Sequence, residues 1–73
     1  MSLYCIVKKG GKPGVELNSN RANTFLEWLK SPDRHETEVI EVSLAGTFIR
    51  RFPQSESERI ASRSQRPKVG RFA

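Results

Sequence analysis

The clearest pattern of apolar and polar positions lies in residues 37–52. From residue 38 to residue 44, apolar side chains nearly alternate with polar ones, and Ile40, Val42 and Leu44 share one face, which is typical of a strand buried on one face. Ala45-Gly46 then supplies a two-residue turn, because glycine adopts positive φ at no steric cost. The residues after this turn form a returning strand, which Pro53 ends because proline has no N–H for a strand ladder. The sequence therefore predicts a β-hairpin.

A two-residue turn also fixes the register of this hairpin. It places Val42 opposite Ile49 on the face toward the core and Glu41 opposite Arg50 on the other face. Such pairs of apolar side chains and of opposite charges stabilise antiparallel strands. A short helix after Ser43 is the alternative, because large apolar residues recur at every fourth position there. A glycine and a threonine within that stretch disfavour a helix, and the hairpin is the interpretation we adopt.

The chain before the hairpin begins with a predicted strand and a loop. Residues 3–7 are all apolar, which suits an interior strand covered on both faces better than an edge strand. Residues 10–14 hold three glycines and a proline, which indicates a loop. An additional short strand near residues 15–17 is the alternative to a continuous loop, although Pro13 disfavours it.

One helix is predicted between this loop and the hairpin. Residues 18–20 are polar side chains of the kinds that cap helix N-termini. Apolar residues then recur at positions 22, 25, 26 and 29, which predicts an amphipathic helix. Pro32 ends the helix, because the residue before a proline disfavours helical geometry. Trp28 lies beside the apolar stripe, and we assign its side chain to the core rather than to an exposed binding position.

The order strand, helix, strand, strand predicts a small α+β domain with one helix packed on a small sheet. A helix between the first strand and the hairpin favours a parallel, right-handed connection between them. The sheet face away from the helix is expected to be partly open. The residues expected to contribute to this open face are Tyr4, Ile6, Glu41, Phe48, Arg50 and Phe52.

The amino-acid composition of the chain changes at residue 54. Residues 54–73 hold four serines and five basic residues against two glutamates, so they carry +3 of the total net charge of +5. We therefore predict a core domain at residues 1–53 and a basic, partly irregular C-terminal tail at residues 54–73. Ser55 and Glu58 have the spacing of a capping box, which predicts a helical turn or two through Arg63.

Length, charge and cysteine content limit the class of protein. A chain of 73 residues buries only about 60% of the surface that its unfolded form exposes, so a deep substrate pocket is not expected. The net charge of +5 favours anionic partners. The lone Cys5 cannot form an internal disulfide, which favours a cytoplasmic location. No secretory signal pattern and no apolar run of about 20 residues is visible, so no membrane partner is expected.

Catalytic and cofactor chemistry is not expected either. The chain holds one histidine and one cysteine, His35 and Cys5, and neither has partners at the spacing of a nucleophilic or metal site. The glycines of the loop match neither the dinucleotide motif nor the P-loop motif. The enzyme alternative is a small ribonuclease with His35 as acid or base and Arg50 or Arg51 stabilising the phosphorane. We expect no cofactor, no metal and no small-molecule substrate.

The charge and the aromatic residues predict a small noncatalytic basic binding module that contacts DNA or RNA. The alternative is a protein-binding regulator or inhibitor, of the compact kind used by mobile elements, which blocks an acidic protein surface by covering it. A structural subunit of a larger assembly is a third class, and the oligomeric state is left open. The candidate nucleic-acid contacts are Lys8, Lys9, Lys12, Phe48, Arg50, Arg51, Arg59, Arg63, Arg66, Lys68 and Arg71.

Overall fold

The protein forms a three-stranded antiparallel sheet with helices on one face. The computed structural model describes residues 2–14 and 16–65. Its strands are β1 (Ser2–Lys8), β2 (Thr37–Ser43) and β3 (Phe48–Arg51), with β2 in the middle of the sheet.

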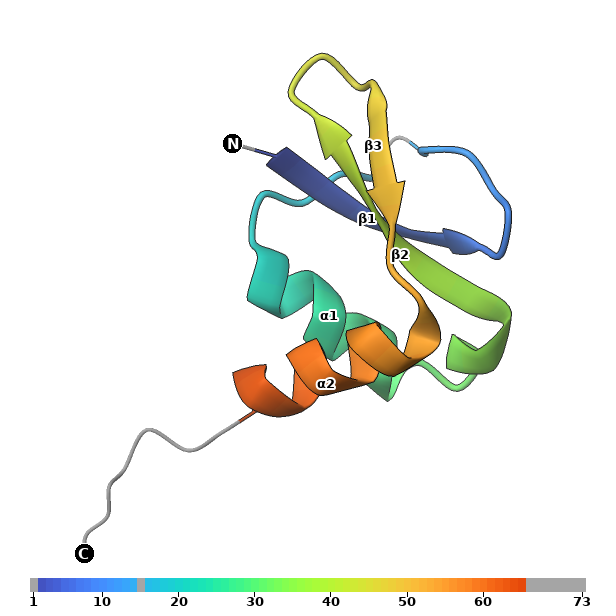
Figure 1. Ribbon diagram of the computed structural model, residues 1–73, viewed down its shortest axis with the longest axis vertical. Helices are drawn as coiled ribbons and strands as arrows, with labels where there is room; N and C mark the ends of the chain where they lie inside the picture. The colour runs from blue at the N-terminus through green and yellow to red at the C-terminus, as the bar shows by residue number, and fades with distance from the viewer. Residues whose placement is uncertain (1, 15, 66–73) are drawn as a thin grey trace, which may run out of the picture.

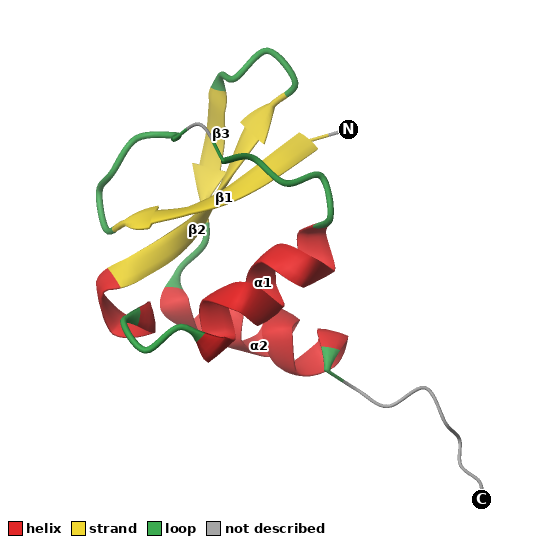
Figure 2. Cartoon of the chain, turned by 180° about the vertical axis from the view of Figure 1, so that it is seen from behind, coloured by secondary structure: helices red, strands yellow, loops and turns green. Residues whose placement is uncertain are grey.

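Two helices lie side by side against the sheet (Figure 1). They are α1 (Arg21–Lys30) and α2 (Gln54–Ser64), and a short 3₁₀ helix, η1 (Arg34–Glu36), precedes β2. Figure 2 shows the same layers from behind, with both helices on one side of the strands. The predicted α+β class and the order strand, helix, strand, strand are confirmed.

The predicted parallel connection between the first strand and the hairpin is wrong. β1 pairs antiparallel with β2, with Lys8 opposite Thr37. The loop after β1 explains the difference, because it runs back along β1 until Asn18 exchanges two backbone hydrogen bonds of 2.8 Å with Tyr4. α1 then runs in roughly the same direction as β1 (Figure 1), so β2 returns in the opposite direction. β1 is also an edge strand rather than the expected interior strand, with Asn18 covering part of its outer side.

β2 and β3 form the predicted hairpin with a turn that is one residue longer than expected. Ser43 donates its N–H to the carbonyl oxygen of Thr47 at 2.8 Å, and its Oγ accepts the N–H groups of Ala45 and Thr47 at 3.2 and 3.1 Å. The turn therefore has three residues between Ser43 and Thr47. Its last residue, Gly46, has a φ of +87°, a conformation that glycine adopts without steric cost.

The longer turn changes the register next to it. Val42 lies opposite Phe48, so the predicted pair of Val42 and Ile49 is wrong. The register then shifts between Glu41 and Val42, and Glu41 lies opposite Arg50 as predicted. A β-bulge at Ile49 accommodates the extra residue and restores the predicted pairing farther from the turn.

α1 has the predicted boundaries. Asn20 caps it, because its Oδ1 accepts the N–H of Asn23 at 2.9 Å. The helix ends at Lys30, and its C-cap is Ser31, the residue before Pro32. The buried side of α1 is centred on Phe25 and Trp28, so it is rotated from the predicted stripe. Trp28 is completely buried, and its predicted role in the core is confirmed.

The main core lies between the helices and the sheet. Tyr4, Ile6 and Phe52 were expected on an open face, and this expectation is wrong because both helices cover that face. The side chains divide between the two sheet faces largely as the alternation predicts, but the helices lie on the face that was expected to be open. The members of this core are Phe25, Trp28, Val39, Phe52 and Ala61, with Tyr4, Ile6, Leu29 and Ile60 packed against them.

A second, smaller cluster lies on the face away from the helices. Cys5, Ile40 and Val42 are buried there. Leu17, from the loop that returns along β1, packs against them. This loop therefore covers a part of the sheet face that the helices leave open.

α2 is a helix of 11 residues that belongs to the core. Its Ser57 and Ala61 are completely buried, and it packs along α1. The N-cap is Pro53, and Ser55 lies inside the first turn, so the predicted capping box is wrong. The composition change after residue 53 thus marks a helix packed on the core at residues 54–64, where a partly irregular tail with a helical turn or two through Arg63 was expected.

Candidate functional site

The exposed large apolar side chains of the described residues all belong to the β2–β3 hairpin. Leu44 is 66% exposed, Phe48 42% and Ile49 47%. Leu44 lies in the turn and Ile49 in the bulge, while Phe48 faces Val42 on the side away from the helices. We call Leu44, Phe48 and Ile49 the hairpin patch. Exposed apolar side chains that gather on one hairpin are typical of a binding surface in a soluble protein.

The hairpin patch lies on an edge strand. β3 is the last strand of the sheet, and no strand in residues 2–14 and 16–65 pairs with its outer side. All four residues of β3 are exposed. An edge strand presents backbone N–H and C=O groups that pair readily with a strand of another chain. The hairpin thus combines apolar side chains with backbone groups that are free to bind a partner.

Arg50 lies on the helix side of β3. Its Nε is 3.3 Å from Oε1 of Glu41, and its guanidinium carbon is 4.3 Å from the centroid of the Phe52 ring. The guanidinium of Arg50 is therefore held between a carboxylate and an aromatic face, where both the charge and the ring attract it.

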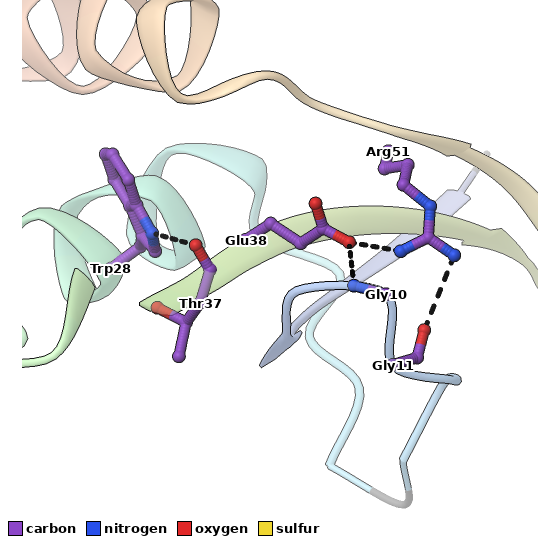
Figure 3. Close-up of polar contacts among 6 residues, drawn as sticks. All are labelled: Gly10, Gly11, Trp28, Thr37, Glu38 and Arg51. Atoms are coloured by element: carbon purple, nitrogen blue, oxygen red, sulfur yellow. Dashed lines mark hydrogen bonds and ion pairs between the residues drawn. The ribbon is translucent and has the colours of Figure 1, made fainter. Parts of the chain in front are cut away.

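Arg51 lies on the other side of β3 and contacts the glycine-rich loop (Figure 3). It forms an ion pair with Glu38, and its guanidinium carbon is 5.0 Å from the centroid of the Phe48 ring. Oε2 of Glu38 also accepts the N–H of Gly10 at 3.1 Å, while Nη2 of Arg51 lies 3.5 Å from the carbonyl oxygen of Gly11. These contacts hold the loop against β2 and β3.

In both ion pairs the cation is the more exposed partner. The side chain of Arg50 is 54% exposed against 16% for Glu41, and that of Arg51 is 40% exposed against 14% for Glu38. A partner that approaches β3 therefore meets the guanidinium groups first. The carboxylates beneath them reduce, but do not remove, the positive potential of this strand.

Several of the predicted nucleic-acid contacts gather around Arg51. Lys9 and Lys12 are exposed on the loop that Arg51 contacts, and Lys8 is exposed at the end of β1. Phe48 lies beneath the guanidinium of Arg51. The structure therefore places the Phe48 ring and the loop that carries Lys9 and Lys12 beside Arg51, whereas Lys8 ends β1, the opposite edge strand of the sheet.

The other predicted contacts do not belong to this surface. Arg50 lies on the opposite face of the sheet, and Arg59 and Arg63 lie on α2 in the helix layer. The remaining three, Arg66, Lys68 and Arg71, lie outside the described residues.

Sequence reasoning missed two members of the hairpin patch. Leu44 and Ile49 were placed on the core face of the hairpin, whereas the three-residue turn and the bulge expose them. One signal was available: a serine followed by glycine three residues later is compatible with a three-residue turn that ends on a positive-φ glycine. That turn shifts the pairing by one residue and removes Ile49 from the core face.

The one histidine and the one cysteine of the chain lie in different environments. His35 is exposed, and its Nδ1 lies 2.9 Å from Nε2 of Gln54, while Cys5 is a buried free thiol. Residues 2–14 and 16–65 contain no group of three or more His, Cys, Asp and Glu side chains that could hold a metal ion. Within the same residues, neither helix has the length and apolar character needed to cross a membrane.

Comparisons with known proteins identify no relative: no family model matches the sequence, and no curated protein or solved structure shows significant similarity to it. The function is therefore inferred from the geometry of this chain.

Proposed function

We propose that this chain is a small noncatalytic protein-binding module that covers a surface of its partner with the β2–β3 hairpin. The observation that carries the proposal is the position of the hairpin patch, Leu44, Phe48 and Ile49, directly beside the free edge of β3. Exposed apolar side chains supply binding energy, and a free strand edge supplies backbone hydrogen bonds to an added strand.

The energetics favour a protein as the partner of this surface. Covering the exposed part of each patch side chain contributes on the order of 1 kcal/mol. Arg50 and Arg51 are each paired with a carboxylate of β2, so this strand offers a phosphate backbone less charge than two free arginines would. The exposed guanidinium groups instead suit a protein interface, in which arginine is enriched and a polar rim surrounds the apolar contact.

The test compares capture from a lysate of the native host by three immobilised proteins. The first is the wild type, the second carries Leu44→Ser and Ile49→Thr, and the third carries Ala22→Ser and Lys30→Gln on exposed positions of α1. We expect a partner that survives nuclease treatment, binds the wild type and the α1 variant equally, and is lost from the hairpin variant. Equal capture by all three proteins would overturn the proposal.

A second candidate function, binding of single-stranded nucleic acid, is favoured by one observation. The guanidinium of Arg51 lies over Phe48 and beside the loop that carries Lys9 and Lys12. A ring beside several cations suits base stacking together with phosphate contacts. Each phosphate contact contributes roughly −0.7 to the slope of log affinity against log salt on single strands and about −0.9 on duplex DNA.

Gel-shift titrations at three salt concentrations test this candidate. Lys9→Gln with Lys12→Gln should flatten the salt slope by about 1–2. Phe48→Ala should weaken single-strand binding by roughly 1–3 kcal/mol and leave duplex binding unchanged. The absence of binding at low salt would rule the candidate out and leave the protein-binding function.

For either function we propose a cytoplasmic location, since a buried free thiol such as Cys5 suits a reducing compartment.

A further inference from the structure

Three arginines of the two helices line one shallow hollow on the helix layer. Arg21 opens α1, and Arg59 and Arg63 lie one turn apart on α2. Together with Glu56 and Ile60 they surround a volume of about 300 Å³. The hollow lies between helices that cover the sheet face opposite Phe48 and Arg51, so it is separate from that part of the hairpin.

The charge of this hollow is largely uncompensated. Arg50 and Arg51 each have a carboxylate partner, whereas no ion pair to Arg21, Arg59 or Arg63 forms among the residues that the structure describes. Glu56 is the one carboxylate that lines the hollow, so the three cations leave a local charge of +2.

The position of Arg21 is also defined by its neighbour on α1. Its guanidinium carbon lies 5.5 Å from the centroid of the Phe25 ring, and that ring is completely buried. The ring face orients the guanidinium through a cation–π contact. One cation of the hollow is therefore held in place before any ligand binds, which lowers the entropy cost of binding.

We propose that Arg21, Arg59 and Arg63 bind the phosphate chain of a small di- or triphosphate. Guanidinium groups bind phosphate oxygens through paired, charge-assisted hydrogen bonds. One guanidinium group can hold one phosphate group through two hydrogen bonds, so three arginines offer donors to a chain of two or three phosphates rather than to a single group. The volume is at the lower end of the range of ligand sites, which suits the phosphate chain itself. This site is independent of the function proposed for the hairpin.

Calorimetric titration of the whole chain with inorganic pyrophosphate and with ADP tests the site, at an ionic strength held constant with sodium chloride. We expect saturable binding of at least one of the two ligands by the wild type. Arg21→Gln, Arg59→Gln and Arg63→Gln should each weaken that binding about tenfold. The matched control is Lys30→Gln, which removes one charge from the other end of α1 and should change the affinity less than twofold.

The outcomes separate the source of the phosphates as well as the existence of the site. Tighter binding of ADP would show that an organic diphosphate is the ligand, and tighter binding of pyrophosphate would show that the free anion is; both results support the proposal. No saturable binding of either ligand would overturn it. An equal loss in Lys30→Gln and in the three arginine variants would also overturn it, because the attraction would then come from the net charge of the chain. Since all three arginines are exposed, the melting temperature should not change in these variants.

Discussion

Nε1 of Trp28 donates a hydrogen bond to the carbonyl oxygen of Thr37 at 3.3 Å (Figure 3). The indole is completely buried, so its N–H needs a partner within the protein. Thr37 is the first residue of β2, and its own Oγ1 donates to the carbonyl oxygen of Asp33 at 3.3 Å. Trp28 thus joins the end of α1 to the start of the central strand, across the connection that contains η1.

Trp28→Phe should lower the free energy of unfolding by roughly 2–3 kcal/mol. The substitution leaves a cavity and removes the only donor of the indole. Urea denaturation followed by circular dichroism measures the change. Glu27→Gln, at the exposed neighbouring position, is the control and should cost less than about 0.5 kcal/mol. If the two variants unfold at the same urea concentration, Trp28 does not hold α1 to β2.

Local signals were sufficient to predict α1 and the existence of the hairpin. The cap at Asn20, the apolar spacing and Pro32 are all read within one short segment, and the structure has the helix where they place it. The antiparallel direction of β1 relative to β2 could not be predicted from such local signals. It depends on the backbone hydrogen bonds between Tyr4 and Asn18, and Asn18 shows no strand pattern in the sequence.

The binding surface was predictable only in part. The pairing of Glu41 with Arg50 follows from the register and is confirmed. The contact of Arg51 with Glu38 and the glycine-rich loop joins residues that are far apart in the sequence, and no local pattern indicates it. The exposure of Ile49 depends on a bulge, and a one-residue change in turn length is enough to move a side chain from one face of a strand to the other.

Ser57→Ala should stabilise the protein by roughly 1 kcal/mol. Ser57 is completely buried, and its Oγ has no hydrogen-bond partner among the described residues. Burying an unsatisfied hydroxyl costs free energy that a methyl group does not. Ser62→Ala, at an exposed position of the same helix, is the control for the higher helix propensity of alanine. Chemical denaturation of both variants gives the difference, and an equal gain in the two would show that the buried hydroxyl carries no penalty.

Gly46→Ala should destabilise the hairpin by roughly 1–2 kcal/mol, because φ at this position is +87°. A Cβ at Gly46 would meet no atom within 4 Å, so the cost comes from the backbone alone. Gly14 is the matched position, since it also has open space around it but no positive φ. Gly14→Ala should be neutral or stabilise by about 0.4–1 kcal/mol through the unfolded state. Thermal melts of the two variants that shift in the same direction would contradict this account of the turn.

The last prediction concerns Glu38, whose carboxylate binds Arg51 and the N–H of Gly10 together (Figure 3). Glu38→Ala removes the acceptor of Gly10, so the loop loses its contact with β2. We expect amide exchange at Gly10 to become at least about fivefold faster, the factor that corresponds to about 1 kcal/mol. Because the ion pair is partly exposed, global stability should fall by less than about 1 kcal/mol.

Glu41→Ala is the control for this experiment. Glu41 lies on the same strand, is about as exposed as Glu38 at 16% against 14%, and also pairs with an arginine of β3. Both variants therefore lose one ion pair and the same strand propensity, but only Glu38 touches the glycine-rich loop. Exchange measured by NMR should change at Gly10 in Glu38→Ala and stay unchanged there in Glu41→Ala. Equal exchange at Gly10 in both variants would show that contacts other than the carboxylate of Glu38 hold the loop. The position beside Arg51 of the loop that carries Lys9 and Lys12 would then not depend on the ion pair of Glu38 with Arg51.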